Sequence, residues 1–494
     1  MTSLIMTAGL IMLIVLLGIL IMVTLFILGL RQRLRNLFQR IEHLAGTVPR
    51  TNLFEIFFSL KAWSWREILL TLQRSATGKK AVHPMGSFIT GTPWLDQIAF
   101  DPASLDSALP SPQNISLKTT IGPAAKKPLK LELPVLIAPM GYGVGLSAQV
   151  KTALAQIATL AGTVASSGEG PFLPEERAYA FQWILQWSQG PWNHQKEAIL
   201  LADMVEIHLS QGAEGQIQIV KHKHLPARIK WMVQGQPVLI HSGSPPLSRL
   251  FSHLKQINPD IPIGVKLTAT NHIENDLKIL MQWPIDVITI DGQEAASQNS
   301  PAVISDHFGI PTAWAIARSR RWLNSHLIHN ISLIASGGVK GAADIAKLIA
   351  LGADAVAVGS PLLFALSHEQ LSQFMPFSWQ GPSNLVFADG PNRTSSHFDV
   401  GQAVHHGVNW FLATKDELRT ILEALGLSTI QALNPRLLIA KSEDVAPLLV
   451  LSQPKIPFVL TQLNGLVEGY AELNHSLFEQ YHLLRPQEKR SPRA

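Results

Sequence analysis

Residues 334–339 read Ile-Ala-Ser-Gly-Gly-Val, and residues 355–360 read Ala-Val-Ala-Val-Gly-Ser. Each stretch is a short apolar run that ends in glycine, and a helical pattern from Ala342 to Leu351 lies between them. Short buried runs that alternate with helical stretches are typical of parallel βα units. The same rhythm extends toward the N-terminus as far as about residue 134, so these two units indicate the fold of the whole central region.

The alternation gives eight apolar runs that we interpret as strands within residues 131–370. They are Val135 to Ala138, Thr163 to Ser166, Phe181 to Leu185, Met204 to Leu209, Ile263 to Leu267, Val287 to Ile290, Ser332 to Ala335 and Ala355 to Val358. For Phe181 to Leu185 the alternative is the continuation of a helix, and the spacing from Met204 to Ile263 requires an insertion. Eight such units predict an α/β fold, a (β/α)8 TIM barrel with its active site at the C-terminal ends of the strands. Residues 31–130 lack this rhythm and are predicted to form an extension that packs on the barrel. A helix from Lys415 to Leu425, ended by Gly426, predicts a helical appendage over residues 371–494.

Residues 4–30 carry no charged side chain and are mostly leucine, isoleucine, methionine and valine. A helix of this length, at about 1.5 Å per residue, crosses the roughly 30 Å hydrocarbon core of a bilayer. A cleaved signal would instead have basic residues before a shorter apolar run. Here four arginines follow the run within residues 31–40. We therefore predict one transmembrane helix over residues 1–30, with the rest of the chain in the cytoplasm.

Composition excludes several functions. The 494 residues are 47% hydrophobic and 15% charged, which favours a large core over disorder. Cysteine is absent, so disulfides, thiolate nucleophiles, cysteine-ligated zinc and iron–sulfur clusters are impossible. The formal net charge of +5 is too small to indicate a nucleic-acid partner, and we predict none.

Two features at the predicted strand ends suggest a ligand site. The two glycine turns let backbone N–H groups approach a ligand at a helix N-terminus, which favours a phosphate between these units. The alternative is that the glycines serve only the turn conformation. Lys266 lies between Val265 and Leu267 in an apolar strand, so its ammonium should face a buried anion or an electron-rich ligand. The alternative is a lysine that reaches solvent from an exposed edge.

Weaker signals accompany these two. Glu169 and Gln211 each lie beside glycine at a strand end, where a solvated loop is the common alternative. His405-His406 and the segment 221–224, Lys-His-Lys-His, do not supply three or four ligands at strand ends. We interpret both as solvated loops and predict no metal site. No Gly-x-Gly-x-x-Gly motif opens a helix after a strand, so electrons must come from a source other than a dinucleotide-fold site.

Nine segments in order along the chain form a pattern. They are Ala138-Pro-Met-Gly-Tyr-Gly-Val-Gly-Leu-Ser147, Ser167-Gly-Glu-Gly170, Glu206-Ile-His-Leu-Ser-Gln-Gly-Ala213, Ser242-Gly-Ser-Pro-Pro246, Val265-Lys-Leu267, Ile290-Asp-Gly292, Ala317-Arg-Ser-Arg-Arg-Trp-Leu323, Leu333-Ile-Ala-Ser-Gly-Gly-Val339 and Ala346-Lys-Leu-Ile-Ala-Leu-Gly-Ala-Asp-Ala-Val356. With these segments the chain resembles the synthase domain of glutamate synthase, and especially the stand-alone FMN-binding glutamate synthase family. The resemblance covers roughly residues 85–430.

The resemblance implies FMN as cofactor and an oxidoreductase that reduces 2-iminoglutarate, formed from 2-oxoglutarate and ammonia, to glutamate. It implies that Lys266, Glu169 and Gln211 are catalytic, with Lys266 and Gln211 at the flavin ring and Glu169 at the substrate. Because no dinucleotide-fold site is visible, we expect an external electron-donor protein as partner. The residues it assigns to FMN are Met140, Gly141, Gln211, Lys266, Ser336, Gly337, Gly338, Gly359 and Ser360.

The chain also departs from the family pattern. Glu214 stands where the family has a lysine that would neutralise a substrate carboxylate. A dicarboxylate substrate would therefore need another positively charged side chain, such as Arg318 or Lys221. The family run Asp-Gly-x-x-Gly-Gly-Thr-Gly reads Asp291-Gly-Gln-Glu-Ala-Ala-Ser-Gln298, which predicts loss of a close backbone approach. Two alternatives follow from these departures: a flavoenzyme for another oxo or imino acid, and a degenerate barrel that serves as a membrane-tethered binding or assembly subunit.

Overall fold

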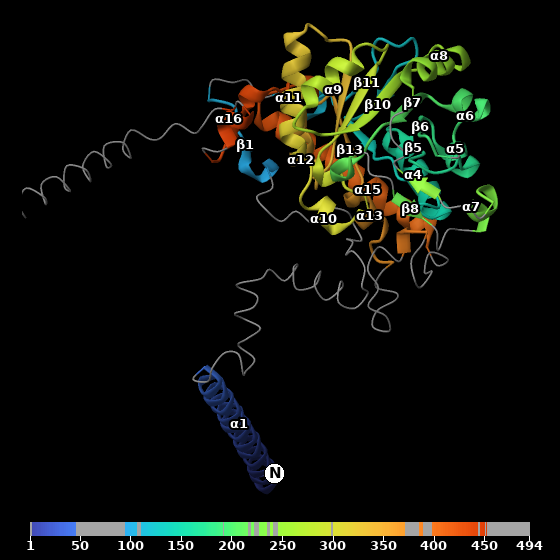
Figure 1. Ribbon diagram of the computed structural model, residues 1–494. Helices are drawn as coiled ribbons and strands as arrows, with labels where there is room; N and C mark the ends of the chain where they lie inside the picture. Colours follow the sequence, from blue (N-terminus) through green and yellow to red (C-terminus); the bar gives the residue numbers. More distant parts are fainter. Residues whose placement is uncertain are drawn as a thin grey trace, which may run out of the picture. The chain divides into compact units, whose positions relative to one another are not determined.

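The computed structural model forms two compact units, Met1–Ala81 and Val82–Ala494 (Figure 1). The described residues are 2–45, 94–105, 110–190, 192–215, 219–221, 227–234, 238–240, 246–297, 300–370, 385–388, 398–442, 445–449 and 451.

The first unit is described through one helix, α1 (Thr2–Ala45). Within it, Leu16–Leu37 has a mean hydropathy of 1.7 and no buried part. This stretch is long and apolar enough to cross a membrane. Among the described residues, no other helix meets both criteria. Signal sequences pass the same test, so membrane anchoring stays a prediction. The helix continues past the predicted limit at residue 30 and through the arginine-rich segment.

The second unit contains the predicted barrel. Its sheet has eight strands in the order β4-β13-β12-β11-β10-β7-β6-β5, and all its strand pairs are parallel. Between β5 and β4 the Ile137 N–H donates to the Val164 carbonyl at 3.3 Å, which nearly closes the sheet. The eight strands are β4 (Val135–Ile137), β5 (Ala165–Ser166), β6 (Trp183–Trp187), β7 (Met204–His208), β10 (Ile263–Thr268), β11 (Val287–Asp291), β12 (Ser332–Ser336) and β13 (Ala355–Val358). The prediction of a (β/α)8 TIM barrel is therefore confirmed.

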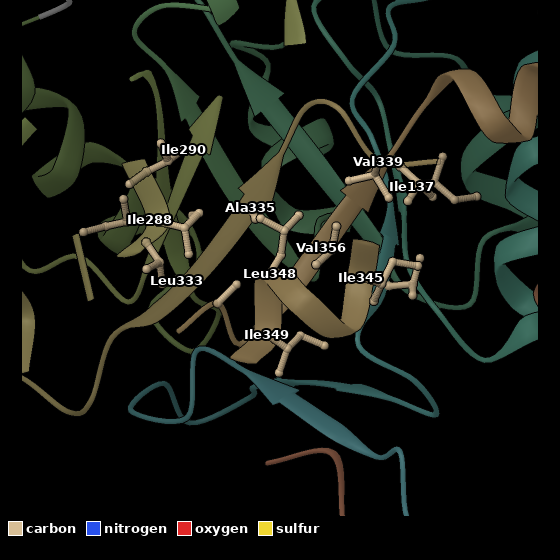
Figure 2. Close-up of a cluster of buried hydrophobic side chains, with 14 of the residues drawn as sticks. Ile137, Ile288, Ile290, Leu333, Ala335, Val339, Ile345, Leu348, Ile349 and Val356 are labelled. Atoms are coloured by element: carbon tan, nitrogen blue, oxygen red, sulfur yellow. The ribbon is translucent and has the colours of Figure 1, made fainter. Parts of the chain in front are cut away.

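Helices cover the outside of this sheet (Figure 1). Alternate strand residues point outward and pack against the apolar faces of the helices. Figure 2 shows Ile345, Leu348 and Ile349 of α12 beside Ala335 and Val356 of the last two strands. The described helices of this layer are α4 (Ala148–Ala161), α5 (Pro174–Tyr179), α6 (Lys196–Leu201), α8 (Leu247–Ile257), α9 (Ile273–Leu280), α11 (Thr312–Ser325), α12 (Ala342–Ala350) and α13 (Ser360–Leu366). Two short helices, α7 (Ala227–Met232) and α10 (Ala302–Ser305), lie in the segments that connect strands, and α10 contacts the turn at residues 212–214.

The barrel interior is apolar toward one end and polar toward the other. The apolar ring includes Val164, Ile184, Met204, Val287 and Ile334. The hairpin of β2 (Thr119–Ile121) and β3 (Leu129–Leu131) packs into the same cluster and covers the N-terminal end of the strands. Toward the C-terminal ends the buried inward positions are polar: Ser166, Gln186, Glu206, His208, Lys266, Thr289, Asp291 and Ser336.

The appendage is built on α15 (Val400–Ala424), which begins at the Asp399 N-cap and is followed by Gly426 at φ 70°. The predicted start of this helix at Lys415 was wrong, because the helix begins at Val400. The interpretation of His405-His406 as a loop was also wrong, because both histidines lie inside this helix. Its buried positions recur every three or four residues and pack on the barrel helices, above all α4. A Cβ on Gly407 would overlap the Ile157 side chain, so glycine there permits close helix packing.

The segments on either side of the barrel meet. β1 (Ile98–Phe100) pairs antiparallel with β14 (Leu438–Ala440). Short helical elements flank this pair: η2 (Trp94–Gln97), η3 (Pro112–Asn114), η8 (Ile430–Ala432), η9 (Pro435–Leu437) and α16 (Val445–Leu449). Loop segments near the strand ends form η4 (Gly212–Glu214), η5 (Gln293–Ala295) and the pair β8 (Ile219–Lys221) and β9 (Val238–Ile240). The domain limits at residues 130 and 370 stay predictions.

Candidate active site

Lys266 lies inside the barrel and forms a buried ion pair. Its Nζ is 2.9 Å from Oδ2 of Asp291, and the two side chains are 3% and 0% exposed. Burial disfavours the ammonium, but the carboxylates of Asp291 and Glu206 outweigh it and raise the pKa of Lys266 above its ordinary value. Lys266 therefore faces a buried anion, as predicted, and does not reach solvent. Its contact with a flavin ring stays a prediction.

Glu206 adds a second buried carboxylate beside this pair. It accepts hydrogen bonds from Gln186 Nε2 at 2.9 Å and Thr289 Oγ1 at 2.7 Å. Burial raises the pKa of Glu206, while the nearby Lys266 ammonium lowers it. Sequence reasoning missed Glu206 and Asp291. The alternation in β7 and β11 could have indicated them, because both residues share the inward face with other polar residues.

Glu169 is buried, contrary to the alternative of a solvated loop. Its Oε2 lies 3.6 Å from Nε2 of His208, an inward residue of β7 that sequence reasoning missed. Gly168 has φ 63°, and a Cβ there would overlap the backbone of Met140. A Cβ on Gly141 would likewise overlap the Glu169 backbone. The glycines thus let the Met140 loop and the Glu169 loop pack backbone against backbone.

Gln211 and Glu214 lie in the turn after β7. The Gln211 backbone exchanges two 3.1 Å hydrogen bonds with Gly215, which closes the turn. Glu214 is 2% exposed, and its Oε1 accepts from the Ser297 N–H at 2.8 Å and from the Ser297 hydroxyl. Its Oε2 has no hydrogen-bond partner among the described residues. The Glu214 charge contributes to the raised pKa of Lys266, so the two groups belong to one electrostatic cluster.

The predicted phosphate-binding residues lie on the last two strand ends. Gly337 and Gly338 have φ of 114° and 72°, and Gly338 and Ser360 are exposed. A Cβ on Gly359 would lie 4.0 Å from Sδ of Met140, so the Met140 loop and this turn are neighbours. Backbone at Gly338 and Ser360 is therefore open to a ligand, whereas Ser336, which ends the strand before them, is buried. The residues present therefore fit the phosphate of a flavin mononucleotide.

A carboxylate lies close to this region. Oε2 of Glu294 accepts from the Thr312 N–H at 3.0 Å and the Thr312 hydroxyl at 2.7 Å, at the start of α11. A Cβ on Gly338 would lie 3.3 Å from the Glu294 side chain. The described part of this run, residues 291–297, lies close to its neighbouring loops although the glycines expected from the resemblance are missing. The glycines that allow this are Gly212 and Gly337, which face Ala295.

Arg318 is not available to the site. It donates to both carboxylate oxygens of Glu274, at 2.8 and 2.6 Å, and also to Asn271. Arg320, on the same helix, pairs with Asp354 at 2.6 Å. The side chain of Lys221 and residues 222–224 lie outside what the structure describes.

The fold and this cluster define a (β/α)8-barrel protein with a buried, charged site at the C-terminal ends of its strands. The family model for the conserved region in glutamate synthase matches residues 104–428. The chain therefore belongs to the glutamate synthase family.

Curated relatives agree with this membership. The chain is 29% identical to an archaeal-type glutamate synthase [NADPH] of Thermotoga neapolitana over 65% of this chain and 64% of that protein. It is 30% identical to the archaeal glutamate synthase [NADPH] of Archaeoglobus fulgidus over 62% and 61%. The chain thus spans just under two thirds of the length of these relatives. Among solved structures, a flavocytochrome b2 variant with pyruvate bound matches 77% of this chain and 85% of its own, with 15% identity and a TM-score of 0.46.

Proposed function

We propose that the protein is an FMN-dependent oxidoreductase of glutamate synthase type. The observation that carries the proposal is the buried Lys266–Asp291 pair at the strand ends of a barrel from this family. When bound, FMN would supply hydride transfer to the substrate. The family reaction is the reduction of 2-iminoglutarate to glutamate.

The chain's own residues have separate roles in this proposal. The backbone of Ser336, Gly337 and Gly338, together with Gly359 and Ser360, would hold the phosphate. The loop of Met140 and Gly141 would lie along the flavin, and Gln211 would contact the ring. Lys266, kept charged by its neighbours, would stabilise negative charge at the ring. Glu169 and His208, 3.6 Å apart, would hold a proton beside the substrate.

Glu214 favours a second candidate, a flavoenzyme for a different oxo or imino acid. Its buried carboxylate shares the cluster with Lys266, Asp291 and Glu206, so three carboxylates surround one lysine. A substrate with two carboxylates would be opposed there. We therefore propose that the preferred substrate carries fewer negative charges than 2-oxoglutarate.

We further propose that α1 anchors the protein in a membrane as a single span, with the barrel in the cytoplasm. The support is the apolar stretch Leu16–Leu37 and the four arginines in residues 31–40. An external electron-donor protein would reduce the flavin.

The test is the visible spectrum of the full-length protein, purified in detergent and supplied with FMN. We expect an absorption band at about 450 nm that bleaches on chemical reduction. The reduced protein is then offered ammonia with 2-oxoglutarate and with a panel of smaller 2-oxo acids, and the amino acids formed are measured. A protein that takes up no flavin would overturn the enzyme proposal and favour the binding or assembly subunit.

A further inference from the structure

A cluster of side chains of the types that ligate metals lies away from the barrel interior, where the turn after α13 meets α15. His406 Nε2 is 3.4 Å from Oε2 of Glu369, and His368 Nε2 is 3.9 Å from Oε1 of the same carboxylate. One ligand atom from each of the three residues lies within 4.8 Å of the others. His406 is mostly buried, whereas His368 and Glu369 are exposed.

We propose that His368, Glu369 and His406 bind a zinc ion. Zn–N distances of about 2.0–2.1 Å in a tetrahedron place neighbouring ligand atoms roughly 3.3–3.5 Å apart. The 3.4 Å separation between Nε2 of His406 and Oε2 of Glu369 already has this value. The 3.9 Å separation joins Nε2 of His368 to the other carboxylate oxygen, Oε1. The three ligand atoms lie within 4.8 Å of one another, so side-chain rotation has to shorten the widest separation by up to roughly 1.5 Å when the ion binds. Two imidazoles and one carboxylate are a donor set that zinc takes, and water at the exposed side completes four ligands.

The backbone that carries the ligands is held in place before any ion binds. The side chain of Gln370, 1% exposed, donates to the carbonyls of Leu366 at 2.9 Å and Asp399 at 3.2 Å. Its Oε1 accepts from the Asp399 N–H at 2.9 Å. These bonds tie the turn with His368 and Glu369 to the start of the helix that carries His406. A preorganised site binds its ion without first ordering the chain.

The Glu369 carboxylate is also held by a neighbouring side chain. Gln402, one helical turn before His406, donates from Nε2 to Oε2 of Glu369 at 3.1 Å. Such bonds orient a ligand carboxylate. The Glu369 backbone has φ 61°, a conformation that residues other than glycine rarely adopt and that clusters at functional positions.

The neighbouring His405 provides a matched control. Its Nε2 lies 3.2 Å from Nδ2 of Asn409, on the same helix, and it is not one of the three clustered ligands. A nonspecific affinity of the histidine-rich helix for zinc would therefore depend on His405, whereas the proposed site would not.

The experiment uses the full-length chain without a polyhistidine tag, purified in detergent and stripped with a chelator. Zinc is titrated in competition with a chromophoric chelator, and thermal unfolding is measured with and without zinc. We expect one Zn²⁺ per chain and a zinc-dependent rise in Tm. His368→Ala and His406→Ala should each weaken zinc binding at least tenfold and abolish the rise in Tm. Gln402→Ala should weaken it by about tenfold, and His405→Ala should leave it unchanged.

The His368→Ala variant keeps the test independent of folding, because His368 is 65% exposed and its metal-free Tm should match the wild type. Zinc binding that survives in both histidine variants, or that is lost equally in His405→Ala, would overturn the proposal. So would a wild-type chain that takes up no zinc at micromolar concentration.

Discussion

The Lys151 ammonium lies 2.8 Å from the Glu176 carboxylate, and the two side chains are 2% and 1% exposed. Lys151 also donates to the carbonyls of Ser166 at 2.6 Å and Ser167 at 3.2 Å. One buried ammonium thus joins α4, α5 and the end of β5. The loop that carries Glu169 begins at this point, so the ion pair positions a proposed catalytic residue.

We predict that Lys151→Met destabilises the protein by about 3–5 kcal/mol, because it leaves Glu176 buried without a cation. Denaturant unfolding followed by tryptophan fluorescence measures this. The double variant Lys151→Met with Glu176→Met should recover part of the loss, since no charge is then left unpaired. A single variant that is no less stable than the double would contradict this account.

A second prediction concerns pH. The hydrogen bonds from Arg318 hold the pKa of Glu274 below its ordinary value. A lowered folded-state pKa stabilises the protein above the unfolded pKa of about 4.3, and this contribution is lost as pH falls through the folded value. Glu274→Gln should therefore be less stable than wild type at pH 7, by about 0.5–1 kcal/mol for a partly exposed pair. We expect the difference to shrink between pH 5 and pH 3, as measured by denaturant unfolding. A difference that does not change with pH would show that the Glu274 charge is not the cause.

The barrel was predictable because its strands carry a local signal. Most apolar runs are followed by a turn and a helix, and this order predicted the strands. For Phe181 to Leu185 it left a helix as the alternative, and residues 183–187 form β6. The start of α15 was not predictable in the same way, since glycines at 401 and 407 and two histidines resemble a loop. Gly407 is tolerated inside the helix because Ile157 of α4 packs against its bare backbone. Tertiary packing overrides helix propensity there.

The site was predictable only in part. Lys266 was found because a lysine inside an apolar strand needs a partner. Its partner Asp291 is 25 residues away and becomes a neighbour through the register of β10 and β11. Glu176 likewise meets Lys151 through helix packing. Such pairs are invisible until the strands and helices are placed.

A third prediction addresses Lys266 in the proposed flavin site. Lys266→Met keeps most of the unbranched side chain but removes the cation, so we expect weaker FMN binding or a more negative flavin potential. Flavin titration and a potentiometric titration measure the two effects. Because the change also leaves Asp291 unpaired, Lys266→Met with Asp291→Asn serves as the control for stability. If the single and double variants bind FMN with wild-type affinity and potential, Lys266 has only a structural role.

A fourth prediction tests the proposed topology and uses the absence of cysteine. Ser248 is exposed on α8, so Ser248→Cys gives a single thiol on the barrel. A membrane-impermeant maleimide added to intact cells should leave this thiol unlabelled and label it after lysis. Thr2→Cys, on the other side of the apolar run, should react in intact cells. The reverse pattern would place the barrel outside the cytoplasm.

The last prediction concerns Glu214, which the resemblance places at a position where a lysine is expected. A second carboxylate a few ångströms from the Glu214 carboxylate would be opposed by about 4 kcal/mol at an effective dielectric near 20. Arg318 cannot compensate, because Glu274 and Asn271 occupy its guanidinium. We therefore expect the flavin-loaded, chemically reduced wild type to form glutamate from 2-oxoglutarate and ammonia poorly or not at all.

Two variants separate the charge of Glu214 from its structural role. Glu214→Gln removes the charge and can keep an oxygen for the hydrogen bonds from Ser297, whereas Glu214→Lys reverses the charge and gives up those bonds. We expect the affinity for 2-oxoglutarate to rise from wild type to Glu214→Gln and again to Glu214→Lys, by at least tenfold in total, with the flavin spectrum unchanged. The measurements are the KM for 2-oxoglutarate and the glutamate formed. A wild type that turns over 2-oxoglutarate at about 1 per second or faster would refute this account of Glu214, because that is an ordinary enzymatic rate.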